Sequence, residues 1–215
     1  MRATADSDPR RPEPNRTRYF AAPSGMMLRR GELFVSQAEV LYTQLNYGLT
    51  DHVTLQGGTL LPAGIFSAGL KIGGPLGERW HLAFGVQGFY LFVNSRALGM
   101  AHGTLTYGTP DAHLSLTVGV PAEKYSLLGK RTSLTTVFAL SGNLRIGQRV
   151  ALVTENWLMP FLPFYSSAPL VNAAGVRLYG QRWALALGLI RIPREPPDFV
   201  VPVAPWIDFS YNLGT

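Results

Sequence analysis

The sequence predicts an all-β protein, a closed antiparallel up-and-down transmembrane β-barrel of about 12 strands, with about ten as the alternative. Three observations lead to this fold class. Turn signals recur steadily along the chain, the segments between them alternate between apolar and polar residues, and the strand spans contain almost no charge. Together they indicate a sheet with one face toward hydrocarbon and the other toward a narrow polar interior.

The composition supports a single membrane-embedded β-domain. Charged residues make up 15% of the 215 residues, against roughly 25% in soluble domains. Hydrophobic residues make up 47%, and the 23 glycines and 16 prolines favour many turns over long helices. Cysteine is absent, which is compatible with assembly outside the cytoplasm without being diagnostic. No run of about 18 apolar residues occurs, so no membrane-spanning helix is expected.

The chain begins with a basic segment, because residues 1–30 carry +4 of the net charge of +6. The stretch SDPRRPEPNRTR within it is rich in proline and arginine. Residues 1–17 are therefore expected to form a disordered arm, and residues 18–215 a single β-barrel domain. No basic folded surface follows the arm, so nucleic acid is not an expected partner. No apolar run of signal-peptide length occurs before residue 30, and two explanations stay open: an export signal removed by processing, or one that precedes the start shown.

Short turns and longer connections alternate along the rest of the chain. The short turns contain LTD, GGPLGE, GTPD, IGQ and YGQ (49–51, 73–78, 108–111, 146–148 and 179–181). The longer connections lie at 61–64, 94–97, 121–131, 160–168 and 193–202. Between them are eleven segments of strand length: 32–48, 52–60, 65–73, 79–94, 97–107, 112–120, 132–145, 149–158, 168–179, 182–192 and 203–213. A short strand at 18–23, RYFAAP, completes twelve, an even number that puts both ends of the barrel on the side of the short turns.

Several segments show a clear period of two, which is the signature of a strand with two different faces. In 132–146 the large apolar residues fall on even positions, and small or polar residues dominate the odd ones. Segment 113–120 places Leu and Val opposite His, Ser, Thr and Gly, and 207–213 repeats the pattern. Each of these segments is therefore predicted to be a strand.

A short motif recurs after four turns, as TDHVTL, GERWHL, GQRVAL and GQRWAL (50–55, 77–82, 147–152 and 180–185). It places Trp80 and Trp183 one or two residues from a turn, with Arg79 and Arg182 beside them. Aromatic rings and arginines are enriched where a membrane barrel meets lipid headgroups. We expect these four residues to form an interfacial girdle.

The charge distribution indicates which solvent each face meets. The spans 80–94, 97–108, 112–120, 132–144 and 183–190 contain no Asp, Glu, Lys or Arg. A soluble barrel or sandwich would carry such residues on its water-facing side. The apolar face is therefore predicted to meet lipid, and a sheet in lipid must close because every backbone group needs a partner.

Four stretches, RYFAAPSG, LRRGE, NYGLTDHVTL and VTEN, resemble parts of uncharacterised outer-membrane β-barrel proteins of Gram-negative bacteria. The resemblance extends over most of the chain. It implies an outer-membrane location, with membrane lipid and the barrel-assembly machinery as partners. It implies no activity and no cofactor.

Five charged residues are predicted to matter inside the barrel. Arg145, Glu155 and Asp208 follow the lumen phase of their strands, Arg177 lies on the same face of its own strand, and Glu39 falls in the middle of a segment. An isolated charge in a narrow lumen is costly. We therefore predict that Arg145 and Arg177 pair with Glu155, Glu39 or Asp208 and close the interior. The alternative is that each charge lies near a water-filled rim.

The stretch DAHLSL is a candidate catalytic site. It places His113 and Ser115 on the lumen face, about 7 Å apart along the strand, with Glu123 in the following connection. This resembles the arrangement of outer-membrane lipid A deacylases, but a hydrogen-bonded polar pair is the simpler interpretation. His81 and His102 are isolated, and no metal ligands converge in the sequence. No catalytic, metal or cofactor site is expected.

Three functions remain as hypotheses. The first is a structural or small channel-like barrel that passes small solutes or none, since about 12 strands enclose less space than a porin of 16–18 strands. The alternatives are an outer-membrane enzyme acting on lipid and a soluble lipocalin-like lipid-binding barrel. Dependence on detergent separates the last from the other two.

Overall fold

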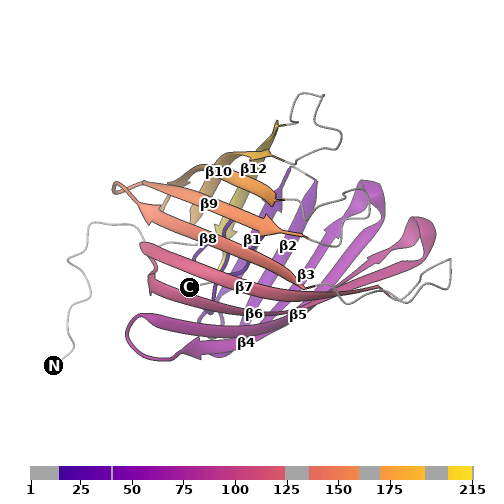
Figure 1. Ribbon diagram of the computed structural model, residues 1–215, viewed down its shortest axis with the longest axis horizontal. Helices are drawn as coiled ribbons and strands as arrows, with labels where there is room; N and C mark the ends of the chain where they lie inside the picture. The colour runs from indigo at the N-terminus through magenta and orange to yellow at the C-terminus, as the bar shows by residue number, and fades with distance from the viewer. Residues whose placement is uncertain (1–14, 40, 124–135, 160–169, 192–202, 215) are drawn as a thin grey trace.

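Twelve β-strands form a closed antiparallel barrel in the computed structural model (Figure 1). The structure describes residues 15–39, 41–123, 136–159, 170–191 and 203–214. The strands are β1 (Leu33–Ala38), β2 (Tyr42–Thr50), β3 (Val53–Leu60), β4 (Ile65–Pro75), β5 (Trp80–Leu91), β6 (Arg96–Thr109), β7 (Ala112–Glu123), β8 (Val137–Arg145), β9 (Val150–Leu158), β10 (Leu170–Tyr179), β11 (Trp183–Arg191) and β12 (Val203–Asn212). Two short 3-10 helices, η1 (Leu61–Ala63) and η2 (Phe92–Asn94), follow β3 and β5.

Closure of the barrel depends on the pairing of β1 with β12, which runs antiparallel from Phe34 with Asn212 to Ala38 with Asp208. Every other strand pairs with its neighbours in the chain. No strand edge is left open in such an arrangement, as a sheet surrounded by lipid requires. The predicted fold class and the count of twelve strands are confirmed.

The N-terminal strands correct the prediction in two places. The expected single segment 32–48 is a hairpin of β1 and β2, and Glu39 lies in its connection with a positive φ of 52°. The expected strand at 18–23 is absent from the barrel wall, and only an isolated bridge joins Arg18 to Pro23. The stretch AEVL at 38–41 contains no Gly, Pro, Asn, Asp or Ser, so no turn signal marks the β1–β2 connection in the sequence.

The two ends of the barrel differ. The tight turns at 51–52, 76–79, 110–111, 146–149 and 180–182 lie at one end, here called the turn end, on the left of Figure 1. The barrel strands also begin and finish there, since the Leu213 N–H donates to the Leu33 carbonyl oxygen at 2.7 Å. The other end, the loop end, carries η1 and η2. Most of the predicted connections at 121–131, 160–168 and 193–202 lie outside the described residues.

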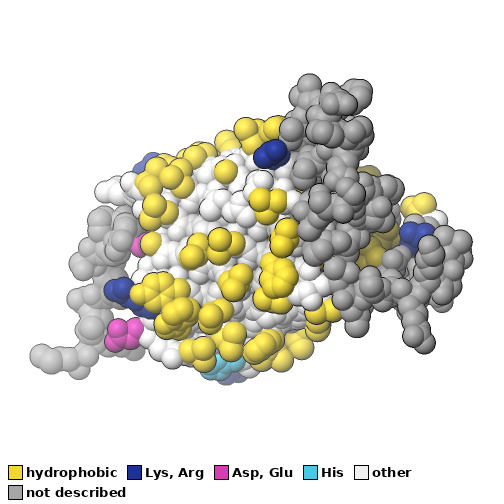
Figure 2. Space-filling model, in the orientation of Figure 1, with side chains coloured by type: hydrophobic (Ala, Val, Ile, Leu, Met, Phe, Trp, Pro, Cys, Tyr) yellow, Lys and Arg dark blue, Asp and Glu magenta, His cyan; other side chains and the backbone are white. Residues whose placement is uncertain are grey.

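The outer surface of the barrel is apolar. Exposed Leu, Val, Ile and Phe side chains alternate along the strands, for example Leu45, Leu114, Leu140 and Leu152. Figure 2 shows hydrophobic side chains spread over the visible wall, with Asp and Glu gathered at the turn end. The described residues contain no helix long and apolar enough to cross a membrane.

The inward face is mainly polar, with an apolar patch on β8 to β11. Among the described residues, buried Ser, Thr, Asn, Gln and His side chains come from most strands, together with buried Lys71, Glu155, Arg177 and Asp208. The predicted assignment of each face is therefore the observed one. A lumen with so many polar and charged side chains differs from the apolar lining that a lipocalin-like lipid-binding barrel needs.

Residues 15–32, here called the inner segment, fold into the lumen from the turn end. Tyr19 and Phe20 at its tip are at most 1% exposed. The tip is a tight turn, in which the Tyr19 N–H donates to the Ala22 carbonyl and the Ser24 N–H to the Thr17 carbonyl, both at 2.9 Å. The tip packs on the wall formed by β8 to β11, against Val137, Ala139, Val153, Trp157, Ala173 and Ala186. Residues 1–14 of the predicted arm lie outside the described residues, whereas Asn15 is already buried.

Candidate functional site

The first contact that holds the inner segment is made by Glu155 of β9. Its Oε2 atom accepts the backbone N–H groups of Phe20, Ala21 and Ala22, each at 2.9 Å, and its Oε1 atom accepts the Trp157 indole N–H. Three successive N–H groups that converge on one oxygen form an anion-binding nest. Glu155 is only 3% exposed, so these donors replace the water that the carboxylate loses on burial.

Two buried cations bind the carbonyl groups of the same segment. The Lys71 Nζ atom donates to the carbonyl oxygens of Met26 at 2.7 Å and Thr17 at 3.3 Å, and so joins the two legs of the hairpin. The Arg177 Nη2 atom donates to the Tyr19 carbonyl oxygen at 2.7 Å. The wall thus presents a carboxylate to backbone donors and cations to backbone acceptors.

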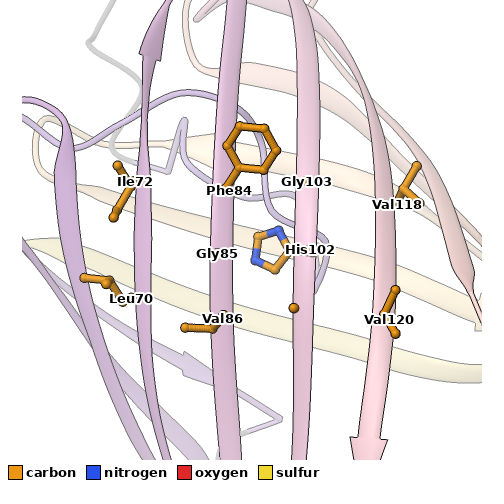
Figure 3. A pocket seen from close by; sticks show the side chains of 10 residues that line it. Leu70, Ile72, Phe84, Gly85, Val86, His102, Gly103, Val118 and Val120 are labelled. Carbon is orange, nitrogen blue, oxygen red and sulfur yellow. The ribbon is translucent and has the colours of Figure 1, made fainter. Parts of the chain in front are cut away.

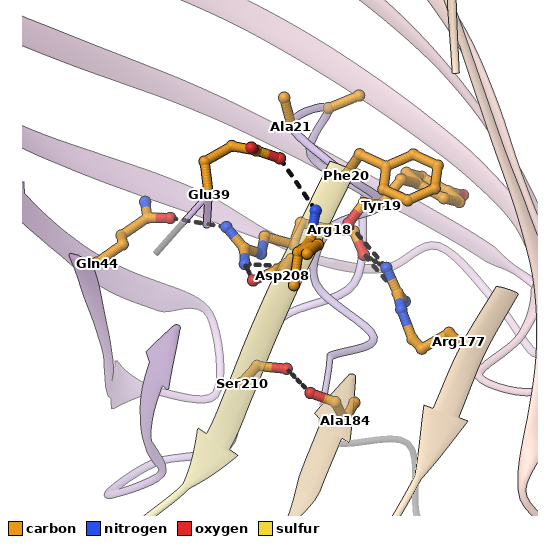
Figure 4. Close-up of polar contacts among 12 residues, drawn as sticks. Arg18, Tyr19, Phe20, Ala21, Glu39, Gln44, Arg177, Ala184, Asp208 and Ser210 are labelled. Atoms are coloured by element: carbon orange, nitrogen blue, oxygen red, sulfur yellow. Dashed lines mark hydrogen bonds and ion pairs between the residues drawn. The ribbon is translucent and has the colours of Figure 1, made fainter. Parts of the chain in front are cut away.

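An ion pair completes the set. The Arg18 Nη2 atom lies 2.7 and 2.6 Å from the two carboxylate oxygens of Asp208, and its Nη1 atom donates to Gln44 Oε1 at 3.2 Å (Figure 4). Arg18 comes from the inner segment, whereas Asp208 and Gln44 point inward from β12 and β2. The tip is therefore attached on both sides of the lumen.

The turn end of the inner segment is fixed by Arg16 and Glu32, whose closest atoms lie 2.6 Å apart. Burial opposes ionisation of Glu32, but the hydrogen bond and charge of Arg16, together with the Arg29 N–H and the Asn212 amide, outweigh it. These contacts lower the pKa of Glu32 below its ordinary value of 4.5. The carboxylate form is thus favoured in the folded state.

The five predicted lumen charges also contact groups that the prediction did not name. Glu155 and Asp208 bind the inner segment, and Arg177 does so too while lying within electrostatic range of Asp208. Arg145 instead pairs with Asp111 at 2.9 Å and lies over the Tyr179 ring near the turn end. Glu39 is exposed in the β1–β2 connection and accepts the Ile207 N–H at 3.0 Å. The inner segment, which was not among the predictions, supplies the contacts described for Glu155, Asp208 and Arg177.

His113 and Ser115 both face the lumen, as predicted, and both contact Tyr19. The Ser115 hydroxyl shares a hydrogen bond with the Tyr19 hydroxyl at 2.6 Å and a second one with Thr106. The His113 ring packs against Tyr19 at a tilt of 47° with centroids 5.2 Å apart, and its Nδ1 atom lies 3.0 Å from the Thr109 carbonyl oxygen. The pair thus supports the inner segment. Within the described residues no group of three or more His, Cys, Asp or Glu could hold a metal ion.

The predicted girdle residues lie at the turn end on the outer surface. Trp80 is 46% exposed and packs against Tyr107 with centroids 4.8 Å apart. Trp183 is 38% exposed and stacks on Phe209. Arg79 and Arg182 are exposed beside them. Their contact with lipid headgroups remains a prediction.

The inner segment leaves a cavity of about 160 Å³ on the side of the lumen opposite the packed tip. Its walls come from β1, β2, β3, β5, β6 and β12, and its lining includes Gln44, Asn46, Gln56, Gln87, Phe89 and Trp206. Arg18 and Phe20 of the inner segment also line it. Phe89 and Trp206 lie in the halves of β5 and β12 nearer the loop end, so the cavity lies toward that end.

A second hollow lies on the outer wall, with a volume of about 410 Å³ (Figure 3). It forms where Gly103 of β6 pairs with Phe84 of β5 and leaves space between larger apolar residues, among them Phe84 and Val118. A Cβ atom at Gly85 would lie 2.4 Å from the His102 Nε2 atom, so glycine is required for the imidazole to pack there. The hollow is apolar, as is the rest of the outer wall.

Two important residues were missed by the sequence argument. Lys71 lies between Leu70 and Ile72 in a strand, in the same way that Arg177 lies between Val176 and Leu178. A charged residue between two large apolar neighbours in a strand points to the lumen, and this pattern identifies Lys71 as a lumen residue. Arg18 was assigned to a wall strand, and no local pattern distinguishes such a strand from a segment inside the barrel.

No protein-family model and no curated protein matches the sequence. Among solved structures the chain is similar to the NanC porin, with a TM-score of 0.60 and 12% identity over 85% of this chain and 99% of that one. It is also similar to the KdgM porin in complex with disordered oligogalacturonate, with a TM-score of 0.61 and 6% identity over 84% of this chain and 96% of that one. At such identities the likeness concerns the fold.

Proposed function

We propose that this chain is an outer-membrane β-barrel of a Gram-negative bacterium, channel-like in architecture, whose lumen is closed at rest by its own inner segment. Small solutes pass when that segment moves. Its partners are membrane lipid and the barrel-assembly machinery.

The membrane location is supported by the surface of the barrel. Large apolar side chains cover the wall, and Trp80 and Trp183 mark one edge of that apolar surface. Placing such a wall in water would be costly at about 25 cal/mol per Å² of apolar surface. The two similar structures are both porins, which agrees with this location.

The closed state is supported above all by Glu155, whose Oε2 atom accepts three backbone N–H groups of the inner segment. A loosely inserted peptide would not be held by a buried carboxylate, two buried cations and an ion pair at once. Each of these contacts is to the backbone or to Arg18. Binding of the inner segment therefore depends on its backbone conformation more than on the side chains of Phe20, Ala21 and Ala22.

Planar-bilayer recording tests this function. We expect the wild type to show no large steady conductance, and Glu155→Ala to open more often because three N–H groups of the inner segment, two of them buried, lose their acceptor. Glu78→Ala, which removes an exposed acid in a turn, is the matched control and is expected to behave as the wild type. A large steady wild-type conductance, or a Glu155→Ala variant with unchanged conductance and stability, would contradict the closed state.

The enzyme alternative is tested separately. Turnover of lipid A or phospholipid by the wild type, lost in His113→Ala, would favour it. The contacts of His113 and Ser115 with Tyr19 instead support a role in holding the inner segment.

A further inference from the structure

The cavity beside the inner segment has the size of one small ring. Its volume is about 160 Å³, and a cavity of about 150 Å³ in another protein holds benzene. A six-membered ring with its substituents pointing to the walls therefore fits, whereas a longer oligomer would have to extend toward the loop end.

The lining offers unused hydrogen-bonding groups. Among the described residues, no protein group hydrogen-bonds to the side-chain amides of Asn46, Gln56 or Gln87. Asn46 is only 4% exposed and lines the cavity. Each amide both donates and accepts, as a hydroxyl group does. A ligand rich in hydroxyl groups would satisfy all three.

The charge at the cavity is already balanced. Arg18 is the lining residue that is always ionised, and both carboxylate oxygens of Asp208 bind its guanidinium group. An anionic ligand would lose its hydration on entering the cavity, and Arg18, already paired with Asp208, would not compensate for that loss. A cationic ligand would lose its hydration in the same way, because Asp208 is already paired with Arg18. The site favours a neutral ligand.

Aromatic rings supply the remaining surface. Trp206 lies edge-on to Phe20 with centroids 6.1 Å apart, and Phe89 lines the cavity from β5. The C–H face of a sugar ring can pack on such rings while its hydroxyl groups reach the amides. A purely apolar ring would leave the amides unpaired, at a cost that selects against it.

We propose that this cavity is a binding site for one ring of a neutral polyhydroxylated solute, of which a pyranose is the simplest example. The site rests on the closed state of the proposed function in one respect, because Arg18 and Phe20 of the inner segment form one of its walls. It does not require that a solute pass through the lumen. Gln56, Gln87 and Asn46 determine the specificity for hydroxyl groups.

Saturation-transfer difference NMR tests this site, with the protein in lauryldimethylamine oxide micelles, which contain no sugar. The probes are methyl β-D-glucopyranoside and, as its charged counterpart, D-glucuronate. We expect transfer from the wild type to the ring protons of the glucoside, and little transfer to glucuronate. In Gln56→Leu and Gln87→Leu the affinity is expected to fall by about fivefold, the loss of roughly one hydrogen bond.

Gln181→Leu, in an exposed turn at the other end, is the control and is expected to bind as the wild type does. A heat-modifiable gel shift verifies that each variant is folded. Absence of transfer to the wild type, equal transfer to glucuronate, or unchanged binding by both Leu variants would overturn the proposal. A protein that dissolves without detergent would refute the membrane location, and the same saturation-transfer experiment in plain buffer would still test the cavity.

Discussion

The guanidinium group of Arg18 contacts both carboxylate oxygens of Asp208, at 2.7 and 2.6 Å, across 190 positions of sequence. One residue belongs to the inner segment and the other to the last strand. The pair therefore couples the position of the inner segment to the strand that closes the barrel with β1.

Replacing one member of this pair should destabilise the protein more than replacing both. Arg18→Met and Asp208→Asn are each expected to cost about 3 kcal/mol, since each leaves a buried group without its partner. The double variant should cost much less than the sum of the two. Urea unfolding of all four proteins in lipid vesicles measures the coupling. Purely additive losses would mean that the two side chains do not act as a pair.

Close packing of the inner segment against β5 depends on Gly25. A Cβ atom there would lie 2.6 Å from the His81 carbonyl oxygen, so Gly25→Ala is expected to destabilise the protein by about 1–3 kcal/mol. Gly147→Ala is the matched control, because nothing lies within 4 Å of a Cβ atom at that turn position. Hydrogen exchange of residues 15–32 should rise in the first variant and stay unchanged in the second. Equal exchange in both would show that the segment is not packed as described.

Acid should loosen the turn end of the inner segment through Glu32. Its pKa is lowered in the folded protein, so the stabilisation is complete above the unfolded value of 4.5 and is lost as the pH falls through the lower folded value. Exchange of residues 28–32 is expected to increase below that range in the wild type. Glu32→Gln should remove this pH dependence. If the variant retains the same acid response, another group is responsible.

Tryptophan quenching tests the predicted girdle. Proteins that keep only Trp80 or only Trp183 should be quenched by phospholipids brominated near the headgroup end of the acyl chain, more than by those brominated near its tail. A protein that keeps only Trp157, which is 8% exposed and faces the lumen, should be quenched weakly by both. Strong quenching of Trp157 alone would invert the assignment of the faces.

The sequence was sufficient for the wall of the barrel because the wall is a repetitive local pattern. Alternation in segments such as 113–120 gives each strand two faces, and the absence of charge between turns shows that the outer face does not meet water. The same pattern failed at 18–23, where an extended stretch with apolar residues looks like a strand but lies inside the lumen.

From the sequence alone came the period of the strands, the solvent of each face and the inward direction of Glu155, Arg177 and Asp208. Only the tertiary structure decided what those charges bind. Their partners are backbone groups and one arginine of residues 15–32, between 133 and 190 positions away, and such contacts exist only once the barrel has closed around the segment. Local alternation reports which way a side chain points, whereas a partner so distant in sequence leaves no local trace.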